Sequence, residues 1–157
     1  MKKKKNGRAA NAPDEPAPAE VSRRTLRLTF AYEASRIELV SQMRVEKITP
    51  PSVTPCPDPK TAAGYWVELR DKRGRCLFHR LLPDAIRDSA EIYPEGKPMA
   101  RAQLREVKGR FEVLFPDVPE ADSVVVMGHP IAAHGLMRHE RCSALATIKL
   151  SREGVQS

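Results

Sequence analysis

The sequence predicts an all-β domain, an antiparallel sandwich of two sheets, behind a disordered N-terminal tail. Apolar and polar residues alternate with a period of two in most segments after residue 24, which is typical of half-buried strands. Turn-forming residues separate these segments, and no segment has a convincing amphipathic helical pattern. Several short strands joined by turns favour a sandwich over a barrel.

Residues 1–24 are expected to form the flexible tail. They are rich in Lys, Ala and Pro, and Val21 is the one apolar residue larger than Ala after Met1, so they cannot offset the entropy of ordering. They carry seven basic and three acidic groups, a net +4 of the chain's +7. The predicted domain covers residues 25–151, and a flexible C-terminus covers 152–157.

Two alternating segments open the domain. In residues 25–32, Leu26, Leu28 and Phe30 share one face of the predicted strand. Residues 36–48 predict a second strand, in which Ser41 interrupts the apolar row and indicates a bend or bulge. Its apolar face is expected to hold Ile37, Leu39, Met43 and Val45, opposite Glu38, Gln42, Arg44 and Glu46.

A proline-rich loop and a β-hairpin follow. Residues 49–63 contain five prolines, which supply no ladder donor, so a loop is expected. Residues 64–71 and 75–82 flank a turn in which Gly74 is expected at positive φ. We expect Trp66 to pack between the sheets, as sandwiches commonly place a tryptophan, and Cys76 to be a small core residue.

The remaining strands are expected at residues 89–94, 109–116, 123–128 and 144–151, which makes about eight in all. Residues 102–107 have a helix as their alternative. The number and spacing of the strands give a sandwich that is immunoglobulin-like in outline.

The central part of the chain carries a family resemblance. Residues 64–75 read G-Y-W-V-E-L-R-D-x-x-G-R, residues 86–93 read I-R-D-x-x-E-I-Y, and residues 111–127 read F-E-V-L-F-P-D-V-P-E-A-D-S-V-V-V-M. This pattern, within residues 64–127, resembles a group of uncharacterised bacterial immunoglobulin-like β-sandwich proteins. It is also similar to accessory sandwich domains that accompany some secreted bacterial peptidases. The resemblance implies the fold, and it implies no activity, cofactor or catalytic residue.

The cysteines and the N-terminus bear on the compartment. The three cysteines are an odd, sparse set, so no disulfide framework is expected. The basic start is not followed by the apolar region of a signal peptide, and no stretch is long and apolar enough to span a membrane. We therefore expect a cytoplasmic protein.

One segment suggests a metal. Imidazole and thiolate groups are good zinc ligands, and four of them lie within 14 residues. Their spacing lacks the paired arrangement of structural zinc sites, so a loop that happens to carry histidines is the alternative. The candidate ligands are His129, His134, His139 and Cys142. A nucleophilic pair of Cys142 with His139 is a weaker hypothesis from the same segment.

Basic residues suggest a polyanion. A lysine cluster attracts nucleic acid, anionic surfaces and acidic proteins alike, and arginines interleaved with aromatic residues on a β surface are typical of single-strand binding. The alternative is a solubilising tail and a solvated hairpin. The candidate residues are Lys2, Lys3, Lys4 and Lys5 in the tail and Arg70, Arg73 and Arg75 in the hairpin.

The sequence contains no nucleophile elbow and no phosphate-binding glycine motif. We therefore expect a non-enzymatic interaction module that needs no cofactor and binds another protein through a sheet edge or its end loops. The first alternative is nucleic-acid or polyanion binding by the tail and the arginine-rich hairpin. The second is metal binding by the histidine and cysteine segment.

Overall fold

The computed structural model describes residues 23–49, 55–83, 86, 89–92, 95–103, 107–131 and 141–152. The predicted tail lies outside the described residues apart from positions 23 and 24, and the predicted C-terminus lies outside them apart from position 152.

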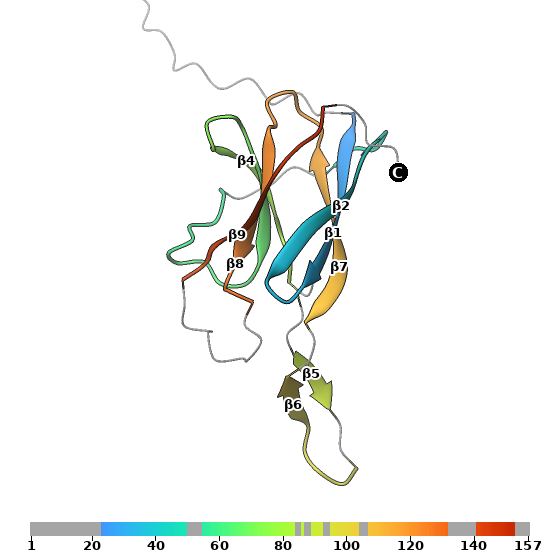
Figure 1. The fold of residues 1–157 in the computed structure, drawn as a ribbon, viewed down its shortest axis with the longest axis vertical. Coiled ribbons are helices and arrows are strands. Elements are labelled where there is room, and N and C mark those ends of the chain that lie inside the picture. The colour runs from blue at the N-terminus through green and yellow to red at the C-terminus, as the bar shows by residue number, and fades with distance from the viewer. Residues whose placement is uncertain are drawn as a thin grey trace, which may run out of the picture.

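The described residues form two packed antiparallel sheets and a separate hairpin (Figure 1). The three-stranded sheet has the order β2 (Arg36–Val45), β1 (Thr25–Glu33) and β7 (Lys108–Pro116). The four-stranded sheet has the order β4 (Cys76–Leu81), β3 (Trp66–Arg70), β8 (Ser123–Gly128) and β9 (Ser143–Lys149). The hairpin of β5 (Ser89–Ile92) and β6 (Ala100–Gln103) projects from one end of the sandwich. The predicted all-β sandwich is confirmed, and no helix, membrane-spanning or otherwise, occurs in this part of the chain.

Strand alternation builds the core between the sheets. The inward side chains of β1 and β7 meet those of β3 and β8, and Phe30 stacks on Phe111 with ring centroids 5.0 Å apart. Each large apolar side chain that is fully buried contributes about 1.5–3 kcal/mol relative to an exposed one. The core side chains with no or almost no exposure include Leu26, Leu28, Phe30, Val67, Leu69, Phe115, Val124 and Val126.

The strand order agrees with that of an immunoglobulin variable domain in one sheet and differs from it in the other. In the four-stranded sheet, the sequence β4-β3-β8-β9 corresponds to the C′-C-F-G order of an immunoglobulin variable domain. In the three-stranded sheet, the first strand of the chain is central and the second lies at the edge. The immunoglobulin order has the second strand central, so the first hairpin is placed the other way round.

A β-bulge in β2 overturns the predicted face of its second half. The register places Phe30 opposite Leu39 and Thr29 opposite Ser41, which leaves Val40 as the extra residue. The predicted irregularity near Ser41 is thus confirmed, but an extra residue reverses the alternation beyond it. Gln42 and Arg44 therefore face the sandwich, with Gln42 5% exposed, while Met43 is 50% exposed. The expected alignment of Met43 and Val45 with Ile37 and Leu39 is wrong for this reason.

Two other predictions about strands have different outcomes. The hairpin turn is confirmed, since Gly74 has a φ of +79°. Residues 100–103 form β6, antiparallel to β5, so the helical alternative for residues 102–107 is wrong where the structure describes them.

Trp66 does not lie between the two sheets. Val67 and Leu69 point into the core, so alternation sends Trp66 to the opposite, outer face of the four-stranded sheet. There it is fully buried in a second cluster with Val125, Met127 and Cys142, against which Ala62 packs. The expectation of a tryptophan between the sheets is wrong because the outer face carries a layer of its own.

Cys56 and Cys76 form a disulfide, with Cα atoms 6.4 Å apart. The expectations of no disulfide framework and of Cys76 as a small core residue are wrong for this pair. The residues are 20 apart in sequence and meet because the loop before β3 folds back to the start of β4. That contact depends on the tertiary fold and leaves no trace in cysteine spacing.

Candidate functional site

The outer edge of β2 bears two exposed large apolar side chains. β2 is ten residues long, and among the described strands it pairs only with β1. Val40 is 44% exposed and Met43 is 50% exposed, and Ile48, just beyond the strand, is 63% exposed. The bulge brings about the exposure of Val40 and Met43, since one is the extra residue and the other follows the reversal of alternation. We call Val40, Met43 and the strand that bears them the β2 edge.

The same reversal anchors the chain after β9 to β2. The Gln42 side-chain amide donates to the Ser151 carbonyl at 2.7 Å and accepts from the Ser151 backbone N–H at 3.1 Å. Arg44 donates from Nε to Asp117 at 3.0 Å and from a terminal nitrogen to the Arg152 carbonyl at 3.2 Å. These contacts hold two sheets together at one side and fix the position of β2 without covering Val40 or Met43.

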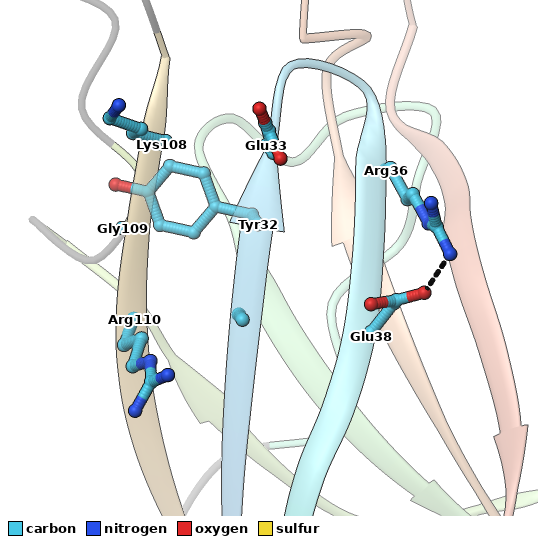
Figure 2. Close-up of a pocket in the computed structure, with 8 residues that line it drawn as sticks. Tyr32, Glu33, Arg36, Glu38, Lys108, Gly109 and Arg110 are labelled. Atoms are coloured by element: carbon cyan, nitrogen blue, oxygen red, sulfur yellow. Dashed lines mark ion pairs between the residues drawn. The ribbon is translucent and has the colours of Figure 1, made fainter.

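A shallow depression of about 420 Å³ lies at the β1–β2 turn (Figure 2). Lys108 and Arg110 lie along β7, and Arg36 forms an ion pair with Glu38 on β2. Figure 2 also shows the Tyr32 ring directed toward β7. The depression is lined by three cationic side chains and two carboxylates, so it is a mixed polar surface rather than a strongly basic site. Lining residues are Ala31, Tyr32, Glu33, Arg36, Glu38, Lys108, Gly109 and Arg110.

Two of the three hairpin arginines proposed to bind a polyanion form ion pairs with carboxylates of the hairpin. Arg70 pairs with Glu68, with 2.6 Å between Nη2 and Oε2. Arg75 pairs with Asp71 at 2.7 Å, and Asp71 also accepts the backbone N–H groups of Arg73 and Arg75. Two of the three arginines thus have carboxylate partners within the hairpin, which reduces the positive charge available to a phosphate. The tail lysines, Lys2 to Lys5, lie outside the described residues.

The Asp71 carboxyl belongs to the turn. The backbone N–H of Arg75 is the largest of the interactions that hold its pKa below the usual value, and the Arg75 guanidinium and the Arg73 N–H add to it, against the opposing effect of burial. A carboxylate with this pattern of donors stabilises the turn conformation.

Two of the four candidate metal ligands are in contact. The Cys142 sulfur lies 3.7 Å from Nε2 and 3.9 Å from Nδ1 of His129. Burial raises the pKa of the Cys142 thiol, which opposes the thiolate form that a metal ligand or nucleophile requires. The thiol instead contacts the Ala62 carbonyl at 3.3 Å. His134 and His139 lie outside the described residues, and within those residues no three His, Cys, Asp or Glu side chains gather as a metal site would need.

A buried polar group lies on the outer face of the four-stranded sheet. The Glu68 side chain is 5% exposed; one carboxylate oxygen accepts the indole N–H of Trp66 at 2.8 Å and the other accepts Arg70 Nε at 2.8 Å. Opposite Glu68 across the β3–β4 ladder is His79, which is also buried. Trp66 and Arg70 both donate to the Glu68 carboxylate, so these three side chains stabilise the outer face of the sheet.

The chain matches no known family model, no curated protein and no solved structure. Its function therefore has to be inferred from its own residues and their arrangement.

Sequence reasoning missed the β2 edge as a particular surface. If the alternation of β2 is continued through Ser41 without a break, Met43 is expected on the buried face together with Ile37 and Leu39. The one signal was the interruption itself, since a polar residue in an apolar row is where a bulge changes the direction of every following side chain.

Proposed function

We propose that this protein is a non-enzymatic interaction module that binds another protein at the β2 edge. The observation that carries the proposal is the exposure of Val40 and Met43 on a long strand with no described neighbour on its outer side. An edge strand presents unpaired backbone donors and acceptors, and a partner strand that pairs with them gains affinity from the backbone and specificity from side-chain contacts.

The charges of β2 are consistent with selective rather than indiscriminate pairing. Arg36 and Glu38 pair with each other, and Arg44 pairs with Asp117. Charged groups and a bulge along an edge strand are the devices that limit uncontrolled edge-to-edge association. A partner strand therefore has to match both the interrupted register and the two apolar side chains.

The experiment is affinity capture from lysate, with nuclease present, using the full chain and two variants. The binding variant carries Val40→Lys and Met43→Lys, and the matched control carries Leu81→Lys at the exposed end of β4, where Leu81 is 65% exposed. Exposed substitutions of this kind change stability by about 0.5 kcal/mol or less, so all three chains are expected to stay folded by circular dichroism.

A discrete protein retained by the full chain and by the Leu81 variant, and lost from the β2 variant, supports the proposal. Equal capture by all three chains would place the contact elsewhere, for example on the end loops. Capture that disappears with nuclease, or with deletion of residues 1–24, would favour the polyanion alternative.

Nucleic-acid binding and metal binding both remain predictions, and each depends on fewer residues than the sequence suggested. Nucleic-acid binding now depends on the tail lysines and Arg73, since Arg70 and Arg75 have acidic partners. Metal binding depends on the contact of His129 with a protonated Cys142. The cytoplasmic location also stays a prediction, and with Cys56 and Cys76 joined the odd cysteine count no longer supports it.

A further inference from the structure

The loop before β3 lies across the outer face of the four-stranded sheet. We call residues 55–64 the strap; Figure 1 shows this loop as the blue-green segment outside the sheet. Ala62 of the strap packs against the cluster that contains Trp66, the chain's one tryptophan. Trp66 has no exposed surface, although it lies on the face of the sheet turned away from the other sheet.

The strap is fastened at two points of unequal strength. Near its beginning, the Cys56–Cys76 disulfide binds it covalently to the start of β4. Near its end, the Cys142 thiol contacts the carbonyls of Ala62 at 3.3 Å and Gly64 at 3.8 Å. A thiol is a weak hydrogen-bond donor, so the second fastening is much the weaker.

Within itself the strap has only a short turn. The Asp58 carbonyl accepts the N–H groups of Thr61 at 3.1 Å and Ala62 at 2.8 Å, and the Asp58 side chain accepts the N–H of Lys60 at 2.9 Å. A segment with a few local hydrogen bonds and little buried apolar surface belongs to the part of a structure that opens at low free energy, unless a cross-link restrains it.

We propose that the strap is a redox-controlled cover over the Trp66 cluster. In the oxidised protein the disulfide keeps the cover closed. A dithiol reductant opens it: one thiolate attacks a cystine sulfur, the S–S bond breaks, and the second thiol of the reductant displaces the other protein sulfur. Two electrons and two protons thus pass to Cys56 and Cys76, and the reductant becomes a cyclic disulfide. Among the described contacts with the sheet, the strap then keeps the weak hydrogen bonds of Cys142 to its Ala62 and Gly64 carbonyls and the packing of Ala62 against the Trp66 cluster.

This inference concerns a different face from the β2 edge and goes beyond the proposed function. Its readout is the shielding of Trp66, so it can fail while partner capture at β2 succeeds, and the reverse also holds.

The experiment measures acrylamide quenching of Trp66 fluorescence in the full chain, oxidised and after reduction by a dithiol. A Cys56→Ser/Cys76→Ser variant represents the permanently opened strap, and Cys142 is its sole thiol. A Cys142→Ala variant is the matched control, because it removes the weak fastening and keeps the disulfide. Circular dichroism follows the sheets in each case.

We expect the quenching constant to rise several-fold on reduction, with the β signal retained. The double-serine variant should be quenched strongly in both conditions. Its Cys142 should react rapidly with a maleimide, whereas the buried Cys142 of the oxidised wild type should react slowly. The Cys142→Ala variant should stay shielded while oxidised.

Three results would overturn the proposal. Trp66 that remains equally shielded after reduction would mean that packing alone holds the strap. Loss of the β signal together with the shielding would make the disulfide a staple for the whole domain. A Cys142→Ala variant that is open while oxidised would assign the closing role to the thiol.

Discussion

Glu68 offers the sharpest test of the energetics, because its carboxylate is buried and both of its oxygens accept hydrogen bonds. In Glu68→Gln the amide has the same shape but only one acceptor oxygen. Whichever way it lies, its NH₂ group faces a donor, either the Trp66 indole or the Arg70 guanidinium. One buried donor therefore loses its acceptor, which costs about 1–3 kcal/mol.

The lost charge adds to this cost. The Arg70 side chain is 27% exposed and can turn partly to water, so we take the lower end of the penalty for breaking a buried pair and expect about 2–4 kcal/mol in total. For a domain of this size that corresponds to a fall in Tm of roughly 6–16 °C.

Glu112→Gln is the matched control. The Arg27–Glu112 pair has the same short contact, 2.6 Å, but its side chains are 47% and 41% exposed. An exposed pair contributes about 0–1 kcal/mol, so the control should lose no more than about 4 °C. Urea and thermal unfolding followed by circular dichroism measure both variants. Equal losses in the two variants would refute the reasoning, since burial would then have no influence on the strength of the pair.

Three further predictions concern other contacts. Gly109→Ala should lower stability by about 1–3 kcal/mol, since its Cβ would lie 2.6 Å from the Tyr32 hydroxyl, and Tyr32→Leu in the same chain should restore part of the loss in urea unfolding. Asp71→Asn should flatten the acid limb of a plot of Tm against pH: the lowered pKa of Asp71 gives stability that is present above its unfolded value of 3.8 and is lost as pH falls through the folded value; an unchanged limb would contradict this. Arg80→Met should cost about 1–3 kcal/mol, because Arg80 Nε donates to a β7 carbonyl at 3.1 Å and its guanidinium lies 5.9 Å from a β7 ring; an unaffected Tm would show that the bridge between β4 and β7 contributes nothing.

Strand alternation predicted most of the fold. Residues of β1 and β7 that alternate in the sequence alternate in the same way in the structure, because each of these strands has one face turned to the core. The sequence of β6 is Ala-Arg-Ala-Gln, which has no large apolar residue to mark a buried face. β6 pairs with β5 through backbone hydrogen bonds, and these produce no alternation of apolar and polar residues from which the strand could be predicted.

The candidate sites were harder to predict for a different reason. The bulge at Val40, the layer around Trp66 and the Cys56–Cys76 bond all depend on contacts between distant segments. A single extra residue in β2 exchanges the environments of Gln42 and Met43, and no local preference of either residue specifies that exchange. The exposure of Val40 and Met43 at the β2 edge therefore depends on the register between β1 and β2, which the sequence pattern does not specify.

The claim that a partner protein binds at β2 is tested most directly by amide hydrogen exchange of the chain, free and with the captured protein bound. A partner strand that pairs with β2 has to slow exchange in residues 36–45, on the amides that point away from β1. We expect the largest change there, and a chain with Val40→Lys and Met43→Lys should show none. Protection concentrated in the β5–β6 hairpin or in β4, with β2 unchanged, would contradict the account.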